Sequence, residues 1–257
     1  MAGQAGFFDF DRRLAAISAK GDPLETINAV VPWERFRADI EVATVTPPET
    51  KKSNAGRPSY DAILKFKMLV IAALYNLSDE ALEFQVRDRL SFMRFLGLDL
   101  HHSVPDATTI WLFREALVKA GKIDALFDLF KQHLEAKGFI ARGGQIIDAT
   151  IIDAPKQRNT REENEQVKAG ETPEDWAKKP AKNRQKDKDA SWTKKHGKSY
   201  FGYKNHIGID KTHKLIRTWD VTTASVHDSQ KLDDLLVAGN TSRDVWADSA
   251  YRSEAAE

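Results

Sequence analysis

Apolar residues recur at helical spacing through the first 140 positions of the chain, and the pattern changes to that of strands after Gly143 and Gly144. The most apolar helix is predicted over 60–77, and a further helix with apolar residues three and four positions apart runs from Ile123 to Gly138. Shorter apolar runs near the amino terminus are interrupted by prolines and predict short helices. We therefore expect the first half to be a compact run of helices.

Polar cap residues divide this helical half into elements. Ser78, Ser91 and Asp106 are predicted to begin helices, because their side-chain oxygens accept hydrogen bonds from the first free backbone amides. Gly97 and Gly138 are predicted to end helices, since glycine adopts the left-handed backbone that commonly follows a last turn. Consecutive helices of this length are compatible with a helix-turn-helix, although core packing explains the same apolar positions.

The second half indicates a sheet with a long polar insertion. Residues 145–153 form an apolar, β-branched run typical of a buried central strand. A polar segment at about 155–200 follows, with glutamates first and lysines later, and is predicted to be exposed and partly disordered. Strand patterns resume as a hairpin over 201–221. A helix capped by Asp228 and closed by Asn240 is expected before the last strand.

Two aspartates occupy comparable places in strands that are far apart in the sequence. Asp148 lies within the first strand, and Asp248 ends the last one. A carboxylate there is costly unless it is paired, hydrogen-bonded or bound to a cation. If the strands lie side by side, the two carboxylates suit a hard divalent cation such as Mg²⁺, which uses few protein carboxylates. We therefore predict Asp148 and Asp248 as metal ligands, with Asp153 as the local rival of Asp148.

Composition sets limits but does not point to a function. The hydrophobic share of 41% and the charged share of 30% are ordinary for a soluble protein, and the net charge of +1 gives no overall argument for a nucleic-acid partner. The lack of cysteine excludes disulfides and thiolate zinc sites. No signal-peptide core is present, and the longest apolar run, 68–75, is far shorter than the roughly 20 residues that span a bilayer. We therefore expect a soluble, cytoplasmic protein.

Local charge leaves two readings open in each of two segments. The basic link at 51–58, which contains Arg57, is either a solvated loop or a loop that contacts DNA phosphate. The lysine-rich part of the insertion, with Lys194 and Lys195, is either solvated or an electrostatic arm whose affinity for a polyanion would depend on salt.

Several motifs, taken together, resemble those of one family. In the first half they are GRPSYDAILKFKML at 56–69, LYNLSDE at 74–80, DRLSFMRFLGL at 88–98 and VPDATTIWLFRE at 104–115. In the second half they are DATIIDAP at 148–155, GYKNH at 202–206, ASVHDS at 224–229 and ADSAY at 247–251. Their order and number make the chain similar to the DDE transposases of bacterial insertion sequences, specifically the "insertion sequence five" family.

The resemblance implies an α+β fold with two regions of different function. Residues 1–140 would be a helical region that binds the ends of the protein's own element. Residues 143–257 would be an incomplete ribonuclease-H-like nuclease domain, a mixed sheet with helices in which the first and fourth strands are neighbours. Three carboxylates, in the order Asp, Asp, Glu, would hold two divalent ions, Mg²⁺ or Mn²⁺, for DNA cleavage and strand transfer. Asp148 and Asp248 match the first two, and the implied active form is a homo-oligomer on DNA.

The chain departs from the family pattern at the third carboxylate. In the family the chain continues to a helix that carries the glutamate, whereas Glu254 and Glu257 follow Asp248 too soon for that role. We therefore expect a fragment, a truncated product or the first frame of a longer element. Lys204 and Arg252 are candidates for contacts with DNA phosphate, and ordinary salt bridges are the alternative.

Three functional readings follow from these observations. The first is a transposase that cuts and joins element ends, and the second is a non-catalytic DNA-binding or dimerising product that inhibits the full-length enzyme. The third is a remnant that does not fold, because an uncovered sheet edge invites aggregation. His206 and His227 are expected to be surface histidines, although either would also suit a place behind the metal ligands.

Overall fold

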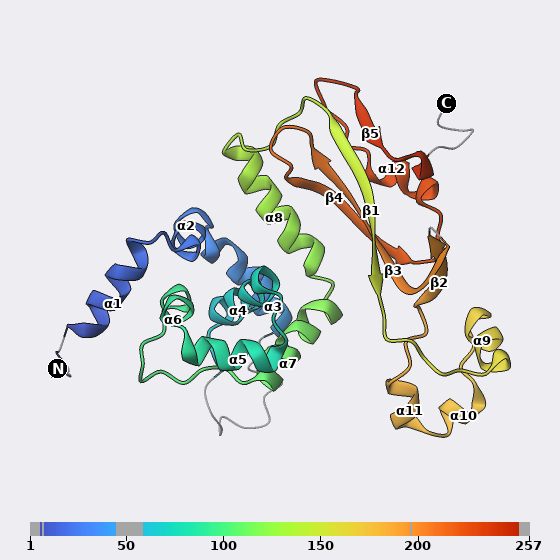
Figure 1. The fold of residues 1–257 in the computed structure, drawn as a ribbon, viewed down its shortest axis with the longest axis horizontal. Coiled ribbons are helices and arrows are strands. Elements are labelled where there is room, and N and C mark those ends of the chain that lie inside the picture. Colours follow the sequence, from blue (N-terminus) through green and yellow to red (C-terminus); the bar gives the residue numbers. More distant parts are fainter. Residues whose placement is uncertain (1–5, 7, 45–58, 196, 252–257) are drawn as a thin grey trace. The chain divides into compact units, whose positions relative to one another are not determined.

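A computed structural model describes residues 6, 8–44, 59–195 and 197–251 of the chain (Figure 1). The chain divides into two compact units, Met1–His133 and Leu134–Glu257, which are described separately. The fold is α+β, with helices in the amino-terminal region and a mixed sheet in the second unit. This architecture confirms the fold class expected from the change of hydrophobic period.

The first unit is built from helices, and α8 continues past its boundary. Their bounds are α1 Asp9–Ser18, α2 Pro23–Val30, η1 Trp33–Phe36, α3 Arg37–Thr44, α4 Ala62–Tyr75, α5 Asp79–Asp88, α6 Leu90–Leu96, α7 Ala107–Lys119 and α8 Ile123–Ala136. The apolar side chains of its core with 0% exposure lie on α3, α4, α5 and α7, and are Ile40, Met68, Ile71, Leu82, Val86 and Ile110.

In the first unit most of the predicted helix boundaries are confirmed, and one is wrong. Ser78 Oγ accepts a hydrogen bond from the Ala81 amide at 3.2 Å, and Gly97 follows α6 in the left-handed region with φ +71°. Ser91, in contrast, lies inside α6 and does not begin it. The helix starts one residue earlier, after the extended backbone of Arg89, because Leu90 already packs against the core.

The second unit is organised around a long strand with partners on both edges. Its strands are β1 Gln145–Asp153, β2 Ser191–Lys195, β3 Lys198–Asp210, β4 Ile216–Thr223 and β5 Val245–Ala247. Strand β3 pairs antiparallel with β1 along one edge and with β2 and β4 along its length, while β5 is parallel to β1 (Figure 1). Strand β1 therefore lies between β3 and β5, as a central strand.

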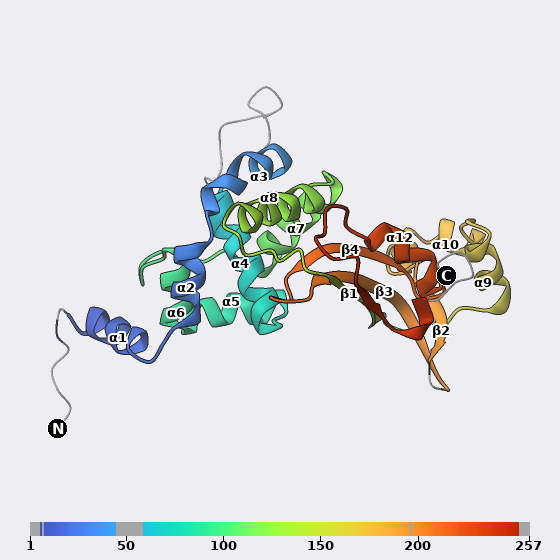
Figure 2. The same cartoon turned by 90° about the horizontal axis from the view of Figure 1, so that it is seen from above.

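One face of this sheet is covered by the short helical turns of the carboxy-terminal part. These are η3 Asp228–Lys231, α12 Leu232–Leu235 and η4 Ser249–Tyr251, and α12 contacts β3 and β4 (Figure 2). Ile147, Leu235 and Tyr251 form the small core beneath them. On the opposite face Ile152, Val221 and Trp246 are 46%, 45% and 39% exposed. The alternation of strand side chains thus gives one packed and one open face.

The expectation that β1 is buried throughout is corrected by the structure. Gln145 and Ile147 are buried, but Asp148 and the last two residues of the strand are exposed. The physical reason is that β5 pairs only with the first three residues of β1, Gln145, Ile146 and Ile147. Beyond them one edge of β1 has no strand beside it among the described residues.

The expected helix after residue 227 is also shorter than predicted. Asp228 does not cap it, because His227 occupies the cap position and its ring nitrogen accepts from the Ser229 amide at 3.3 Å. The turn η3 passes into the single helical turn α12, which ends at Leu235, well before Asn240. The side chain of Asn240 instead accepts a hydrogen bond from Arg217.

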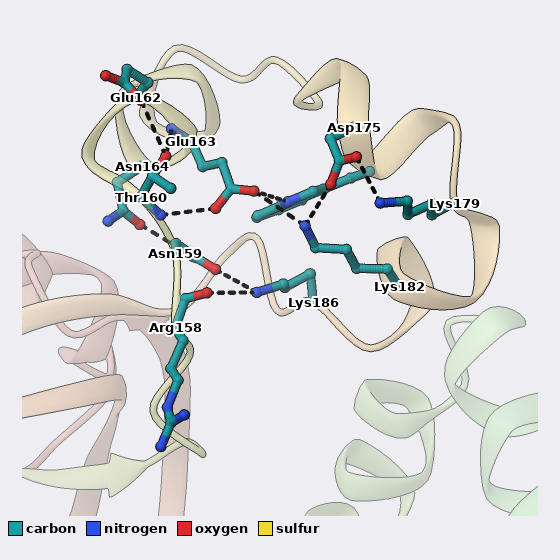
Figure 3. A network of polar contacts seen from close by, with 11 residues as sticks. Arg158, Asn159, Thr160, Glu162, Glu163, Asn164, Asp175, Lys179, Lys182 and Lys186 are labelled. Carbon is teal, nitrogen blue, oxygen red and sulfur yellow. Dashed lines mark hydrogen bonds and ion pairs between the residues drawn. The ribbon is translucent and has the colours of Figure 1, made fainter.

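The polar insertion, predicted to be partly disordered, is a folded segment. It contains α9 Arg161–Lys168, α10 Glu174–Ala177 and α11 Pro180–Arg184, and Trp176 in α10 is 0% exposed. The Trp176 indole donates to Glu163 at 2.6 Å, and the Lys182 ammonium contacts Glu163 at 3.3 Å and Asp175 at 2.8 Å (Figure 3). Charged residues of the kind that suggested disorder, Glu163 and Lys182, instead form the hydrogen bonds and ion pairs around the buried Trp176.

Glu163→Ala should therefore loosen this insertion. Glu163 accepts hydrogen bonds from the Thr160 amide, the Trp176 indole and Lys182. Leaving the buried indole without an acceptor should lower the free energy of unfolding by about 1–3 kcal/mol. Urea unfolding and limited proteolysis of the segment measure the effect. Glu162→Ala is the matched control, since its carboxylate makes only a 3.5 Å contact with the Thr160 hydroxyl, and equal losses in both variants would contradict the prediction.

Candidate functional site

The parallel pairing of β1 and β5 brings Asp148 and Asp248 to neighbouring backbone positions. Ile147 is the register partner of Ala247, and each aspartate is the next residue along its chain. Both aspartates are exposed. One carboxylate oxygen of Asp148 accepts from the Ala149 amide at 2.8 Å, and one of Asp248 accepts from the Ala250 amide at 2.8 Å.

The rival aspartate lies elsewhere on the same strand. Asp153 is the last residue of β1 and is paired with Gly202 of β3. At ~3.3 Å per residue, five residues of strand separate it from Asp148 by about 17 Å. The structure therefore places Asp148, and not Asp153, beside Asp248.

A third carboxylate, that of Asp228, lines the same pocket as Asp248, although its residue was predicted only as a helix cap. Asp228 accepts from the Lys204 ammonium at 2.8 Å, and the two side chains are 13% and 12% exposed. Lys204 also donates to the Val226 carbonyl at 2.7 Å. The position of Asp228 in the ASVHDS motif was the only signal in the sequence, because its partner lies 24 residues earlier on β3.

Asp228, Asp248 and several cations line one small pocket. The pocket has a volume of about 200 Å³, and its charged lining residues are Lys194, Lys195, Lys204, Asp228 and Asp248. Asp148 does not line this pocket, although the next residue of β1, Ala149, does. An acidic strand end beside exposed ammonium groups is an arrangement that suits a cation together with a phosphate group.

A buried polar chain runs beneath the aspartates. His206 is 0% exposed, which corrects the expectation of a surface histidine, and its ring nitrogens lie 3.3 Å from the Tyr251 hydroxyl and 3.0 Å from the Thr222 hydroxyl. Burial lowers the pKa of His206. Burial also raises the pKa of the Tyr251 hydroxyl, and the negative charges of Asp228, Asp148 and Asp248 raise it further.

The chemistry of the aspartate pair fits a hard divalent cation. Each carboxylate offers hard oxygen donors and uses one oxygen in a hydrogen bond with a nearby backbone amide. The tightest cluster of candidate ligands lies in the first unit, where atoms of Asp99, His101 and His102 are within 4.8 Å of one another. No other group of three acidic or histidine residues in the described ranges has ligand atoms that close together. An ion bound by Asp148 and Asp248 would therefore have only these two protein ligands, and water and phosphate would fill most of its coordination positions.

The remaining predicted site residues are only partly placed. Lys194 and Lys195 lie at the end of β2 and are exposed, and they form no ion pair within the described ranges. Arg57 and Arg252, predicted to contact DNA, lie outside the described residues, as do Glu254 and Glu257. In the part of the chain that is described, every helix is too short or too polar to cross a bilayer.

Comparison with protein families gives two matches that follow each other along the chain. Residues 12–116 match the family described as Transposase domain (DUF772), and residues 141–256 match the Transposase DDE domain. No solved structure matches the chain. The two matches support an insertion-sequence DDE transposase, a class that acts on DNA, and the DDE domain family normally uses divalent metal ions.

The Lys204–Asp228 pair should contribute measurably to stability. Lys204→Met leaves a carboxylate that is only 13% exposed without its cation, and we expect a loss of about 2 kcal/mol in the free energy of unfolding. Adding Asp228→Asn should recover part of that loss, because the two effects are coupled. Urea unfolding of both variants and of Lys194→Met, an exposed lysine of the same pocket, measures this. If the losses in the free energy of unfolding from Lys204→Met and Asp228→Asn simply add in the double variant, a direct interaction between the two side chains is contradicted.

Proposed function

We propose that this protein, with its two transposase domains, catalyses metal-dependent DNA strand cleavage and strand transfer at the ends of an element of the "insertion sequence five" family. We assign a ribonuclease-H-like fold to residues 143–257 and DNA-end binding to residues 1–140. The observation that supports the proposal is the parallel register of β1 and β5, whose last pair, Ile147 with Ala247, directly precedes the two motif aspartates. The sheet order, with β5 parallel to β1 and β3 antiparallel to it, supports the fold assignment.

In this proposal the chain's own residues hold and orient the reacting groups. Asp148 and Asp248 would hold divalent ions, Mg²⁺ or Mn²⁺, through their carboxylate oxygens. Of the two ions expected, one would lower the pKa of a water or a DNA 3′-hydroxyl, and the other would stabilise the leaving oxygen. Lys194 and Lys195, which are exposed beside Asp248 in the same pocket, contact the DNA phosphates. Lys204 lines the same pocket, but its ammonium binds Asp228. Its main role in this proposal is therefore to orient the Asp228 carboxylate.

A second function is a non-catalytic DNA-binding or dimerising product that inhibits full-length transposase. The observation that favours it is that the third nearby carboxylate, Asp228, is neutralised by Lys204 at 2.8 Å. A carboxylate held in that way is a poor metal ligand unless the ion pair opens. In this case the same cations would bind element ends, alone or in a homo-oligomer, and the aspartates would be without a catalytic role.

Asp148→Asn and Asp248→Asn should each reduce DNA cleavage by about 100-fold or more, since each removes a charge that holds the catalytic ion. The measurement is cleavage and strand transfer on element-end DNA with Mg²⁺ or Mn²⁺, using the 257-residue chain. Asp153→Asn, on the same strand, is the control and should keep activity. Full activity in either of the first two variants would refute the assignment, and binding of ends without any cleavage would favour the second function.

Replacing Lys194 and Lys195 together by methionine should weaken DNA binding without sequence preference. Each lysine that contacts a phosphate releases about one counterion, so the slope of log affinity against log salt should fall by roughly 2. Binding of element-end DNA between low and moderate salt measures the slope. Lys178→Met is the control, because Lys178 pairs with Glu174 at 3.3 Å inside the insertion. An unchanged slope in the double variant would place the DNA elsewhere.

A further inference from the structure

A chain of polar side chains on the covered face of the sheet links β4 and β3 to the turn that follows Asp248. Thr222 on β4, His206 on β3 and Tyr251 in η4 form this chain through contacts of 3.0 and 3.3 Å. His206 is 0% and Tyr251 2% exposed. Buried polar groups are costly unless they are satisfied, so such a chain favours one particular arrangement of the elements that contribute to it.

Tyr251 connects this chain to both aspartate-bearing strands. Its ring packs in one cluster with Leu235 and with Ile147, the residue that precedes Asp148. Its backbone amide donates to the Asp248 carbonyl at 3.2 Å, and the amide of Ala250 donates to the Asp248 carboxylate at 2.8 Å. One residue therefore anchors the turn of Asp248 against the strand of Asp148.

The His206 ring can connect the two hydroxyls because it is neutral. Burial lowers the pKa of His206, and a neutral imidazole has one donor and one acceptor nitrogen. The ring therefore donates to one of the two hydroxyls, Tyr251 or Thr222, and accepts from the other. Burial and the negative charges of Asp228, Asp148 and Asp248 raise the pKa of the Tyr251 hydroxyl, so it stays protonated and able to form its hydrogen bond.

We propose that Tyr251, held by His206 and Thr222, is a positioning residue that fixes the Asp248 turn beside Asp148 before a divalent cation binds. The part that concerns the cation rests on the proposed function. The part that concerns the turn does not, because it depends only on the hydroxyl–imidazole–hydroxyl chain and on the packing of the Tyr251 ring. A turn held in this way would reduce the entropic cost of cation binding, because the cation would not have to order the turn itself.

The test uses Tyr251→Phe, which removes one oxygen and keeps the ring on Ile147 and Leu235. The first readout is hydrogen exchange of the Ala250 amide, measured by NMR on the whole chain without metal. Losing one buried hydrogen bond should speed that exchange by about fivefold. The second readout is Mn²⁺ affinity by calorimetry, which should weaken by about tenfold, as found when groups behind metal ligands are removed.

Tyr203→Phe is the matched control within the same unit. Its hydroxyl donates to Asp187 at 2.6 Å, at the insertion and away from the Asp248 turn. We expect this variant to lose global stability while the relative protection of the Ala250 amide and the Mn²⁺ affinity stay within twofold, in line with one lost hydrogen bond far from the turn. Thr222→Val is the second test variant, and it should act in the same direction as Tyr251→Phe but more weakly.

The two readouts separate this inference from the proposed function. Unchanged exchange at Ala250 in Tyr251→Phe would overturn the inference, whatever the metal does. Unchanged Mn²⁺ affinity in Tyr251→Phe, with weakened affinity in Asp148→Asn and Asp248→Asn, would overturn it as well, because the pair would need no preformed turn. A third outcome is faster Ala250 exchange in Tyr251→Phe together with Mn²⁺ affinity that is unchanged in Asp148→Asn and Asp248→Asn. It would support the role of Tyr251 at the turn and refute the assignment of the two aspartates as metal ligands.

Discussion

The parallel backbone pairing of β1 with β5 is the constraint on which the candidate site depends. It joins only three residue pairs, and the last of them, Ile147 with Ala247, sets the neighbouring positions of the two aspartates. A slip of one residue would turn every side chain of the shorter strand to the other face. The packing of Tyr251 on Ile147 resists such a slip, because it fixes the turn that follows β5 to a residue of β1.

The second feature of the site is the amount of polar burial that surrounds it. His206, Tyr251 and the Lys204–Asp228 pair lie on the covered side of the sheet or at its edge, with little exposed surface. Apolar residues of similar size would fill the same space without a desolvation cost. Such polar groups specify one arrangement of the turns η3 and η4, since any other arrangement would leave donors or acceptors unpaired.

Charge in this protein is distributed by local pairing, so the net value says little about a partner. The cations Lys182 and Lys186 lie near the ring of Trp176, and Lys182 also binds Glu163 and Asp175 (Figure 3). The cations of the β2 end make no such ion pairs within the described ranges. The contrast separates the lysines of this segment that form structural ion pairs from those that do not.

The sequence by itself determined the features that depend on near neighbours: the helices and most of their caps, the main strands, and the motif aspartates Asp148 and Asp248. Periodicity and capping are local, so they can be read from residues a few positions apart. Only the tertiary structure decided that Trp176 is buried, that Asp228 binds Lys204 and that His206 lies beneath the aspartates. Each of these depends on partners more than ten residues away, and a polar residue looks the same in the sequence whether solvent or a distant strand satisfies it.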